Sequence, residues 1–430
     1  MWFLVSTAIL AVGGFVAWAV AAWAQPVAVV GGATGLFAAV LFLTYLTGMG
    51  LPVAVARFGH GPEEQTEGLW RWTLGYAAVA SAVGSLAFVL VAPAVLGSST
   101  TGPLTDRGPL MATLLLTLLV GGTSWATLAE IRLMTLRAWP WMVLRTLVTV
   151  VVRIPLVLSP LAATPLGLLL VMAGPTAASG AVTVALLAWR RGGRRRWTWV
   201  RPEGLAVAWR FASVNWVGSL AAQAPQFVTP LIVAAAVPAA ENAGFYLAWS
   251  ISTVVFLIPH TIGQVVVSES SRHPSDLRRQ ARTGLVLGVA LTGFAALVAW
   301  VGAPAVTAIF GPDYGTTAEV LPVLCLAALP WTVTSIGLAV MRTLADAFGT
   351  TAITVGFALL TLIPMVILVD TRGVDGAPIA WLAGNLAASA LAMAVVGIRQ
   401  RQRRRQVDTF TPAPRTSPTT GPSAASSVVA

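Results

Sequence analysis

Residues 283–309 read TGLVLGVALTGFAALVAWVGAPAVTAI, and none of these twenty-seven residues carries a charge. A helix rises about 1.5 Å per residue, so a stretch of this length crosses the roughly 30 Å hydrocarbon core of a bilayer. Eleven similar apolar stretches, each bounded by charge, Gly or Pro, lie at about 2–23, 32–56, 70–96, 110–130, 139–161, 166–189, 207–236, 244–267, 320–341, 348–369 and 376–398. The pattern predicts twelve transmembrane helices, because strands of a membrane β-barrel need only about 9 to 11 residues of alternating polarity.

The composition agrees with an all-α polytopic membrane protein. Hydrophobic residues make up 57% of the 430 residues and charged residues only 10%, whereas a soluble domain runs near a quarter charged. Twelve spans with short loops leave no room for a folded soluble domain. The sequence has no Walker A loop, no cluster of zinc ligands and no nucleophile elbow, so we expect neither an enzyme nor a metal or cofactor site.

The basic residues predict the orientation of the chain. The net charge is +11, from 26 basic and 15 acidic residues, and a soluble chain with this balance would suggest a nucleic-acid partner. Here the basic residues are all Arg and lie between apolar stretches, where they report topology instead. One set of loops carries Arg57, Arg71, Arg132, Arg137, the six arginines of 190–201, Arg272, Arg278, Arg279, Arg282 and Arg342, and the opposite loops carry only Arg107 and Arg372. The positive-inside rule therefore predicts a multi-pass protein of the plasma membrane, with both termini in the cytoplasm and no nucleic-acid partner.

The first apolar stretch has a second interpretation. Ala22-Trp23-Ala24 resembles a signal-peptidase site close to the start of the chain. No Arg precedes the apolar stretch, and it is longer than the 7 to 15 residues of a signal sequence, so we favour a retained helix.

Two pairs of similar segments indicate an internal repeat. Residues 172–179 (MAGPTAAS) and 382–389 (LAGNLAAS) match at five of eight positions with a shift of 210, and residues 35–39 and 244–248 agree at a shift of 209. Parallel repeats of this kind occur in transporters that rock one half against the other. The repeat predicts an N-terminal six-helix lobe at 1–189, an Arg-rich cytoplasmic linker at 190–206, a C-terminal six-helix lobe at 207–398, and a basic, then disordered tail at 399–430.

Five segments in order along the chain resemble a known family. They are Gly35-Leu-Phe, Leu51-Pro-Val-Ala-Val-Ala-Arg57-Phe, Gly244-Phe-Tyr-Leu-Ala, Phe310-Gly-Pro-Asp-Tyr314 and Gly373-Val-Asp-Gly-Ala-Pro-Ile-Ala380. Together they resemble the polysaccharide biosynthesis, or oligosaccharide flippase, branch of the multidrug/oligosaccharidyl-lipid/polysaccharide exporter superfamily. The resemblance implies two six-helix lobes that form a V around a central cavity. It also implies a polyprenyl-pyrophosphate-linked glycan as substrate, and as partners membrane lipids and the glycosyltransferases or polymerase of the same pathway.

Three arginines are candidates for binding the pyrophosphate. Counted from Trp139 at the predicted interface, Arg153 lies roughly 21 Å and Arg145 roughly 9 Å into the fifth span. Charges at such depth usually face a cavity, and Arg offers a bidentate fork to phosphate oxygens. The alternative for Arg153 is an Arg satisfied by carbonyls of a neighbouring helix. Arg57, at the inner end of the second span, either meets phosphate or only fixes topology.

Uncharged polar residues mark two further spans. Asn215, Ser219, Gln223 and Gln226 share one face of the seventh span, where they line a sugar path or bond helices together. In that span Pro225 and Pro230 predict a kink or break. In the eighth span His260 is either a proton-linked switch or a packing histidine.

The acids near span ends separate the function classes. Glu130 and Asp346 lie close to Arg132 and Arg342, so we expect local charge pairs there. A flippase or exporter of lipid-linked glycans is the leading hypothesis. A drug/cation antiporter of the same superfamily would need an acid deep in a lobe, and a membrane glycosyltransferase would need acids on a large outer loop, whereas the loop at 97–109 is short and holds one acid. A non-transporting scaffold stays open.

Overall fold

The structure is a computed structural model that describes residues 2–59, 63–190, 204–272 and 274–410. Its regular elements are all helical within these ranges. The first half contains α1 (Trp2–Ala24), α2 (Val27–Gly48), α3 (Leu51–Phe58), α4 (Glu63–Leu96), α5 (Ser98–Thr105), α6 (Pro109–Thr135), α7 (Trp139–Val157) and α8 (Pro165–Arg190). The second half contains α9 (Leu205–Ala236), α10 (Ala239–Arg272), α11 (Leu277–Phe310), α12 (Gly315–Leu326), α13 (Ala328–Thr343), α14 (Ala347–Arg372) and α15 (Gly376–Phe410).

The helices confirm a multi-pass membrane protein. Eleven stretches of the described residues are long and apolar enough to cross a membrane. The last stretch, 347–402, has 56 residues and contains both α14 and α15, which a short 3-10 turn at Gly373–Asp375 separates. Counting these two helices separately gives the twelve crossings that the sequence predicts.

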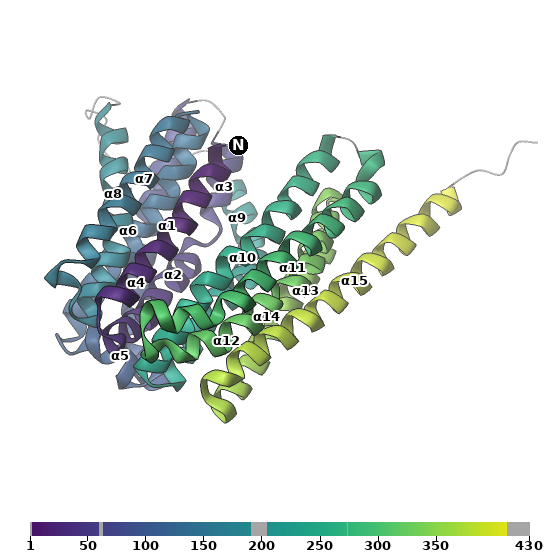
Figure 1. The fold of residues 1–430 in the computed structure, drawn as a ribbon. Helices are drawn as coiled ribbons and strands as arrows, with labels where there is room; N and C mark the ends of the chain where they lie inside the picture. Colours follow the sequence, from purple (N-terminus) through teal and green to yellow (C-terminus); the bar gives the residue numbers. More distant parts are fainter. Residues whose placement is uncertain (1, 60–62, 191–203, 273, 411–430) are drawn as a thin grey trace, which may run out of the picture.

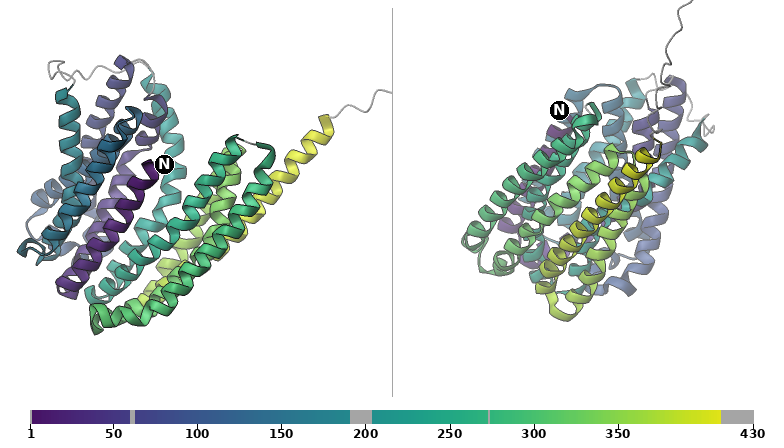
Figure 2. Two further views of the ribbon diagram at one scale, coloured as in Figure 1. Left: turned by 45° about the horizontal axis from the view of Figure 1, so that its top comes forward. Right: turned by 90° about the vertical axis from the view of Figure 1, so that its right-hand side faces the viewer.

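The helices form two groups that make a V (Figure 1). We call α1–α8 the first lobe and α10–α15 the second lobe. The two lobes lie together at the lower end of the view and diverge at the upper end, near the start of α1 and the far end of α15, and Figure 2 shows the same divergence from another side. Helix α9 packs against α2 and α3 of the first lobe and α14 of the second. The predicted lobe boundary at 190–206 stays a prediction, because residues 191–203 lie outside the described part of the chain.

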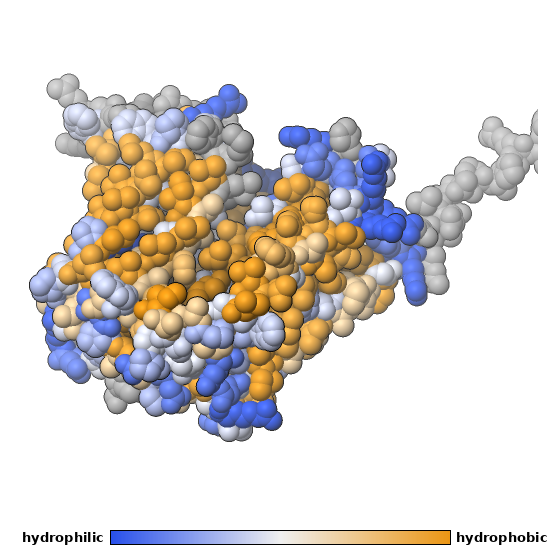
Figure 3. Space-filling model, viewed as in Figure 1, coloured by the Kyte–Doolittle hydropathy of each residue, from blue (hydrophilic) through white to orange (hydrophobic). Residues whose placement is uncertain are grey.

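A broad apolar band crosses the visible face of the molecule, and hydrophilic residues gather above and below it (Figure 3). Many large apolar side chains of the molecule are exposed, among them Leu118 on α6 and Phe294 on α11. In a soluble protein such exposure would be costly, but in a bilayer these side chains contact lipid. The same view shows a notch between the lobes at the open end.

Two predicted spans are broken, which corrects the single helices expected at 32–56 and 320–341. Between α2 and α3, Met49 and Gly50 have φ angles of 46° and 69°, so the backbone leaves the right-handed helix. Pro52 then starts α3, a position that tolerates its missing N–H. The tenth span divides at Ala327 into α12 and α13. Of the kink or break predicted in the seventh span, the break is excluded, since α9 is continuous through Pro225 and Pro230.

A turn that occurs once in each half agrees with the predicted repeat. After α6 the N–H of Ala138 bonds to the carbonyl of Leu133, and Arg137 has a φ of 54°. After α13 the N–H of Asp346 bonds to the carbonyl of Met341, and Ala345 has a φ of 52°. Both are Schellman turns, 208 residues apart, and each ends a helix at the open end of the V.

The closed end of the V depends on close backbone contact between α2 and α10. A Cβ added to Gly31 would lie 1.6 Å from the carbonyl oxygen of Ala239, so only glycine allows this approach. The buried Asn242 side chain donates to the carbonyl of Gly31 at 2.8 Å and to the Thr34 hydroxyl at 2.9 Å. These contacts join the two lobes where the cleft between them ends.

Candidate functional site

A cavity of about 280 Å³ opens in the second lobe. It is lined mainly by α10 and α13, with contributions from α9, α14, α15 and Thr7 of α1. Its size is close to the lower end of the range for small-molecule sites. The polar and aromatic side chains of the lining are Thr7, Gln223, Gln226, Trp249, Ser252, Thr253, Phe256, His260, Gln264, Trp331, Ser335, Arg342, Phe357 and Trp381.

Helical spacing explains why α10 and α13 line it. On α10, Trp249, Phe256, His260 and Gln264 follow one another at seven, four and four residues, which places them on one face. His260 lies eleven residues after Trp249 on α10, and Arg342 lies eleven residues after Trp331 on α13. Eleven residues are about three turns, or roughly 16 Å. Each helix therefore presents an aromatic residue deep in the cavity and a basic residue toward the open end of the V.

Five aromatic rings form the deep part of the cavity, and we call them the aromatic floor: Trp249, Phe256, Trp331, Phe357 and Trp381. The ring centroids of Trp249 and Trp381 are 4.8 Å apart, and those of Trp331 and Phe357 are 4.7 Å apart. Phe256 lies 5.6 Å from Trp381 and 6.4 Å from Trp331. The indole N–H of Trp381 is buried without a hydrogen-bond partner in the described structure.

Basic and amide side chains form the outer part, which we call the polar mouth: Gln223, Gln226, His260, Gln264 and Arg342. Arg342 and His260 are exposed and both line the cavity. Within the described part of the chain, none of the five side chains forms a hydrogen bond or ion pair with another residue. The described lining contains no Asp or Glu.

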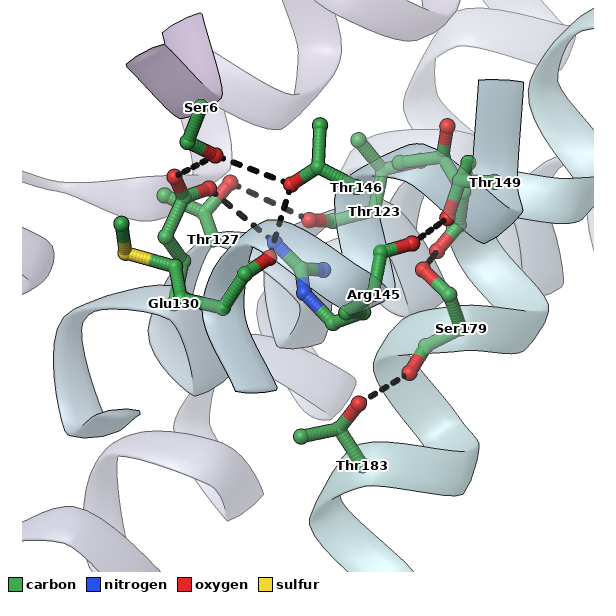
Figure 4. Close-up of polar contacts among 11 residues, drawn as sticks. Ser6, Thr123, Thr127, Glu130, Arg145, Thr146, Thr149, Ser179 and Thr183 are labelled. Carbon is green, nitrogen blue, oxygen red and sulfur yellow. Dashed lines mark hydrogen bonds and ion pairs between the residues drawn. The ribbon is translucent and has the colours of Figure 1, made fainter. Parts of the chain in front are cut away.

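The charges of the first lobe are placed differently (Figure 4). Arg145 on α7 pairs with Glu130 on α6 at 3.1 Å. The Ser6 hydroxyl on α1 donates to the other oxygen of Glu130 at 3.2 Å and lies 2.9 Å from the Thr146 hydroxyl. This network ties three helices together inside the lobe.

Two expected charge pairs are therefore corrected. Glu130 pairs with Arg145, one span further along, and Arg132 pairs with Glu67 of α4 at 3.1 Å. Asp346 pairs with Arg399 of α15 at 2.8 Å, and its carboxylate also caps α14 through the N–H of Gly349. Sequence distance missed both pairs, because helix packing brings residues from different spans together.

Arg153 on α7 also has a hydrogen-bond partner within the first lobe. It is 6% exposed and donates a hydrogen bond to the Thr176 hydroxyl on α8, while its Nε has no partner in the described structure. It interacts electrostatically with Tyr246 on α10, which lies in the second lobe. Arg153 is not part of the cavity lining.

The remaining predicted site residues divide between the cavity and its surroundings. Gln223, Gln226 and His260 line the cavity. Asn215 donates to the carbonyl of Phe211 in its own helix, and neither it nor Ser219 is in the lining. Arg57 lies over the ring of Phe211 of α9, 4.6 Å from its centroid.

The sequence interpretation missed Arg342 and the aromatic floor. The sequence assigns Arg342 to topology and to a local pair with Asp346, because it lies at the end of a span. The usable signal was its spacing from Trp331 and Ser335, which places all three on one face of a helix. The aromatic floor combines α10, α13, α14 and α15, so no local pattern could reveal it.

Comparison with known proteins identifies the fold. No model of a known protein family matches the chain, and no curated protein matches it in sequence. Among solved structures, an inward-facing multidrug resistance MATE family transporter of the MOP superfamily aligns with a TM-score of 0.69 at 16% identity, over 95% of this chain and 99% of that chain. The lipid II flippase MurJ in an inward closed conformation aligns with a TM-score of 0.71 at 12% identity, over 92% of this chain and 87% of that chain.

A third structure distinguishes conformations. An outward-facing MATE family transporter of the MOP superfamily aligns with a TM-score of 0.57 at 15% identity, over 93% of this chain and 94% of that chain. The two inward structures therefore align better than the outward-facing one. The chain thus shares its fold with these three transporters, and its lobes superpose better on the two inward structures than on the outward-facing one.

Proposed function

We propose that this protein moves polyprenyl-pyrophosphate-linked oligosaccharide or polysaccharide precursors outward across the plasma membrane by alternating access. The observation that carries the proposal is the charge of the cavity. Its described lining holds Arg342 and His260 and no carboxylate, so it favours an anionic substrate over a cationic one. Enzymatic chemistry is not part of the proposal, and membrane lipids and enzymes of the same glycan pathway are its proposed partners.

The open end of the V is proposed to face the cytoplasm. The ends of α3, α6, α8 and α13 that carry Arg residues lie at this end, which the positive-inside rule places in the cytoplasm. The predicted orientation is checked by reporter fusions, which should read as cytoplasmic after Arg282 and as external after Thr101. An external reading after Arg282 would place the open end of the V outside the cell and would contradict the proposed direction of transport.

Arg153 fits the second conformation of such a cycle. In the present conformation it is closed off beside Tyr246, where the two lobes meet. Rocking the lobes apart at the closed end would separate α7 from α10 and expose the guanidinium. We propose that Arg153 meets the pyrophosphate in that outward conformation. Arg57 at the inner mouth and Arg145 stay further predicted contacts for the pyrophosphate, and Asn215 and Ser219 stay predicted lining.

A multidrug antiporter is the second candidate, and the aromatic floor favours it. Aromatic faces attract organic cations, and several of the similar structures are MATE transporters. Against it, the carboxylate of Glu130 is already paired with Arg145.

Transport in proteoliposomes separates the two candidates. The purified protein is reconstituted with a fluorescent lipid-linked oligosaccharide, and movement between leaflets is followed by quenching from outside. A second set of vesicles receives a cationic dye with a proton or sodium gradient. We expect movement of the lipid and not of the dye. Gradient-driven dye movement without lipid movement would contradict the flippase and support the antiporter.

A further inference from the structure

The polar mouth places the side chains of Arg342 and His260 in one cavity lining, whose described residues include no acid. Both side chains are exposed to the cavity, and Arg342 carries a fixed positive charge. Within a membrane protein, a positive charge costs free energy unless an anion compensates it. The described lining supplies none. Gln264 lies four residues after His260 on the same helix face and adds an amide that has no protein partner in the described structure.

Trp249 and Trp331 of the aromatic floor lie about three helical turns deeper than His260 and Arg342, so the cavity is long and has two chemically distinct ends. Trp331 is half-buried and presents part of its ring to the cavity. The floor is not purely apolar, because the unpartnered indole N–H of Trp381 and the nearby hydroxyls of Ser252 and Thr253 add polar atoms. Flat aromatic faces beside such polar atoms suit a ring that has C–H bonds on one face and hydroxyls at its edge.

We propose that this cavity binds a glycosyl pyrophosphate in one orientation, with the phosphates held by Arg342 and His260 at the polar mouth and the sugar rings on the aromatic floor. The inference rests on the proposed function and assigns its substrate contacts to the second lobe. Arg342 can hold two phosphate oxygens through its planar fork, and an imidazole N–H of His260 adds a third donor. Gln223 and Gln226 lie beside the path between the two ends and can bond sugar hydroxyls.

We assign the polyprenyl chain of the substrate to the bilayer and not to the cavity. A purely apolar chain in the floor would leave the indole N–H of Trp381 without a partner, and an unsatisfied buried polar group is costly. A sugar hydroxyl compensates it, whereas the bilayer itself accommodates the chain.

Calorimetric binding to the full-length protein in nanodiscs tests the proposal with three probes. These are inorganic pyrophosphate, a short-chain prenyl pyrophosphate, and the same prenyl pyrophosphate carrying a disaccharide. Arg342→Gln removes the charge, Trp331→Leu removes an aromatic face, and Arg278→Gln is the matched control, since Arg278 is exposed on α11 at the same end of the lobe and outside the cavity. Thermal unfolding verifies that each variant is folded, and Arg342→Lys replaces Arg342→Gln if the latter is not.

We expect Arg342→Gln to weaken binding of all three probes by roughly tenfold to a hundredfold, as for a lost charge-assisted hydrogen bond. Arg342→Lys should retain part of the affinity. Trp331→Leu should weaken only the disaccharide probe, and Arg278→Gln should change none. Unchanged binding in a folded Arg342→Gln protein would overturn the phosphate site, and equal weakening of both prenyl probes by Trp331→Leu would assign the floor to the lipid chain instead.

The two proposals can fail separately. If wild-type protein moves the lipid-linked oligosaccharide in proteoliposomes but Arg342→Gln binds like wild type, the cavity assignment is wrong and the proposed function stands. If the binding pattern holds but wild-type protein moves no lipid-linked oligosaccharide, the site stands and the proposed function is wrong.

Discussion

The candidate basic residues of the first lobe have partners within the described structure, whereas those of the second lobe do not. In the first lobe Arg145 pairs with Glu130, and Arg153 bonds to Thr176. In the second lobe Arg342 and His260 face the cavity, with no ion pair or hydrogen bond to another described residue. The difference teaches that depth in a span does not by itself indicate a substrate site. A charge that has protein partners contributes to packing in that conformation, whereas one that lacks them is available to a ligand.

The largest effect should come from breaking the pair in the first lobe. Glu130→Ala leaves Arg145 buried without its carboxylate, and removing one partner of a buried pair costs about 3 to 5 kcal/mol, here nearer the lower value because Glu130 is 22% exposed. Unfolding in detergent, followed by heat or denaturant, measures this loss.

The control is the double variant Glu130→Gln with Arg145→Leu, which removes both charges and should regain much of the stability. Arg342→Gln in the second lobe should leave stability near that of wild type, because no protein partner loses its bond. A large loss of stability in Arg342→Gln would mean that Arg342 contributes to packing as Arg145 does, and would contradict the difference between the lobes.

Lipid transport by variants of Arg153 extends the comparison between the two lobes. We expect Arg153→Ala to stay folded in the membrane and to reduce lipid movement roughly tenfold to a hundredfold, since one charge-assisted hydrogen bond of about 1.5 to 3 kcal/mol is lost in the outward conformation. Arg153→Lys should keep part of the activity, because the charge remains but the bidentate geometry does not. Binding of pyrophosphate to the inward conformation should be unchanged.

The stability of the Arg153 variants distinguishes a structural role of this residue from a role in substrate binding. If this residue only ties α7 to α8, Arg153→Ala should instead lower the amount of folded protein, and lysine should rescue transport only as far as it rescues stability. Full transport by a stable Arg153→Ala protein would remove the residue from the mechanism.

The smallest effect should come from the hydroxyls around Glu130. Ser6→Ala removes a hydrogen bond to the Glu130 carboxylate and should lower stability by about 1 kcal/mol, detectable as a small decrease in melting temperature. Gln264→Ala in the polar mouth removes an amide without a protein partner and should not change the melting temperature. A reversed ranking of these two variants would mean that the mouth is held by protein contacts.

Much of the fold could be predicted from the sequence, because a bilayer demands long apolar helices and Arg clusters mark their ends. The break after Gly48 was missed, since Met49 adopts a left-handed conformation that nothing in its apolar neighbourhood signals. At the site, helical spacing singled out the two glutamines as candidate lining and His260 as a switch or packing residue. Arg342 and the aromatic floor were not, because their common cavity depends on how four helices pack.

The most direct test of the account is a cryo-electron microscopy structure of the full-length protein in nanodiscs with the prenyl pyrophosphate that carries a disaccharide. The account predicts density for the phosphates between Arg342 and His260 and density for the sugars against Trp331 in the inward conformation. Phosphate density beside Arg145 in the first lobe, with the cavity of the second lobe empty, would contradict it.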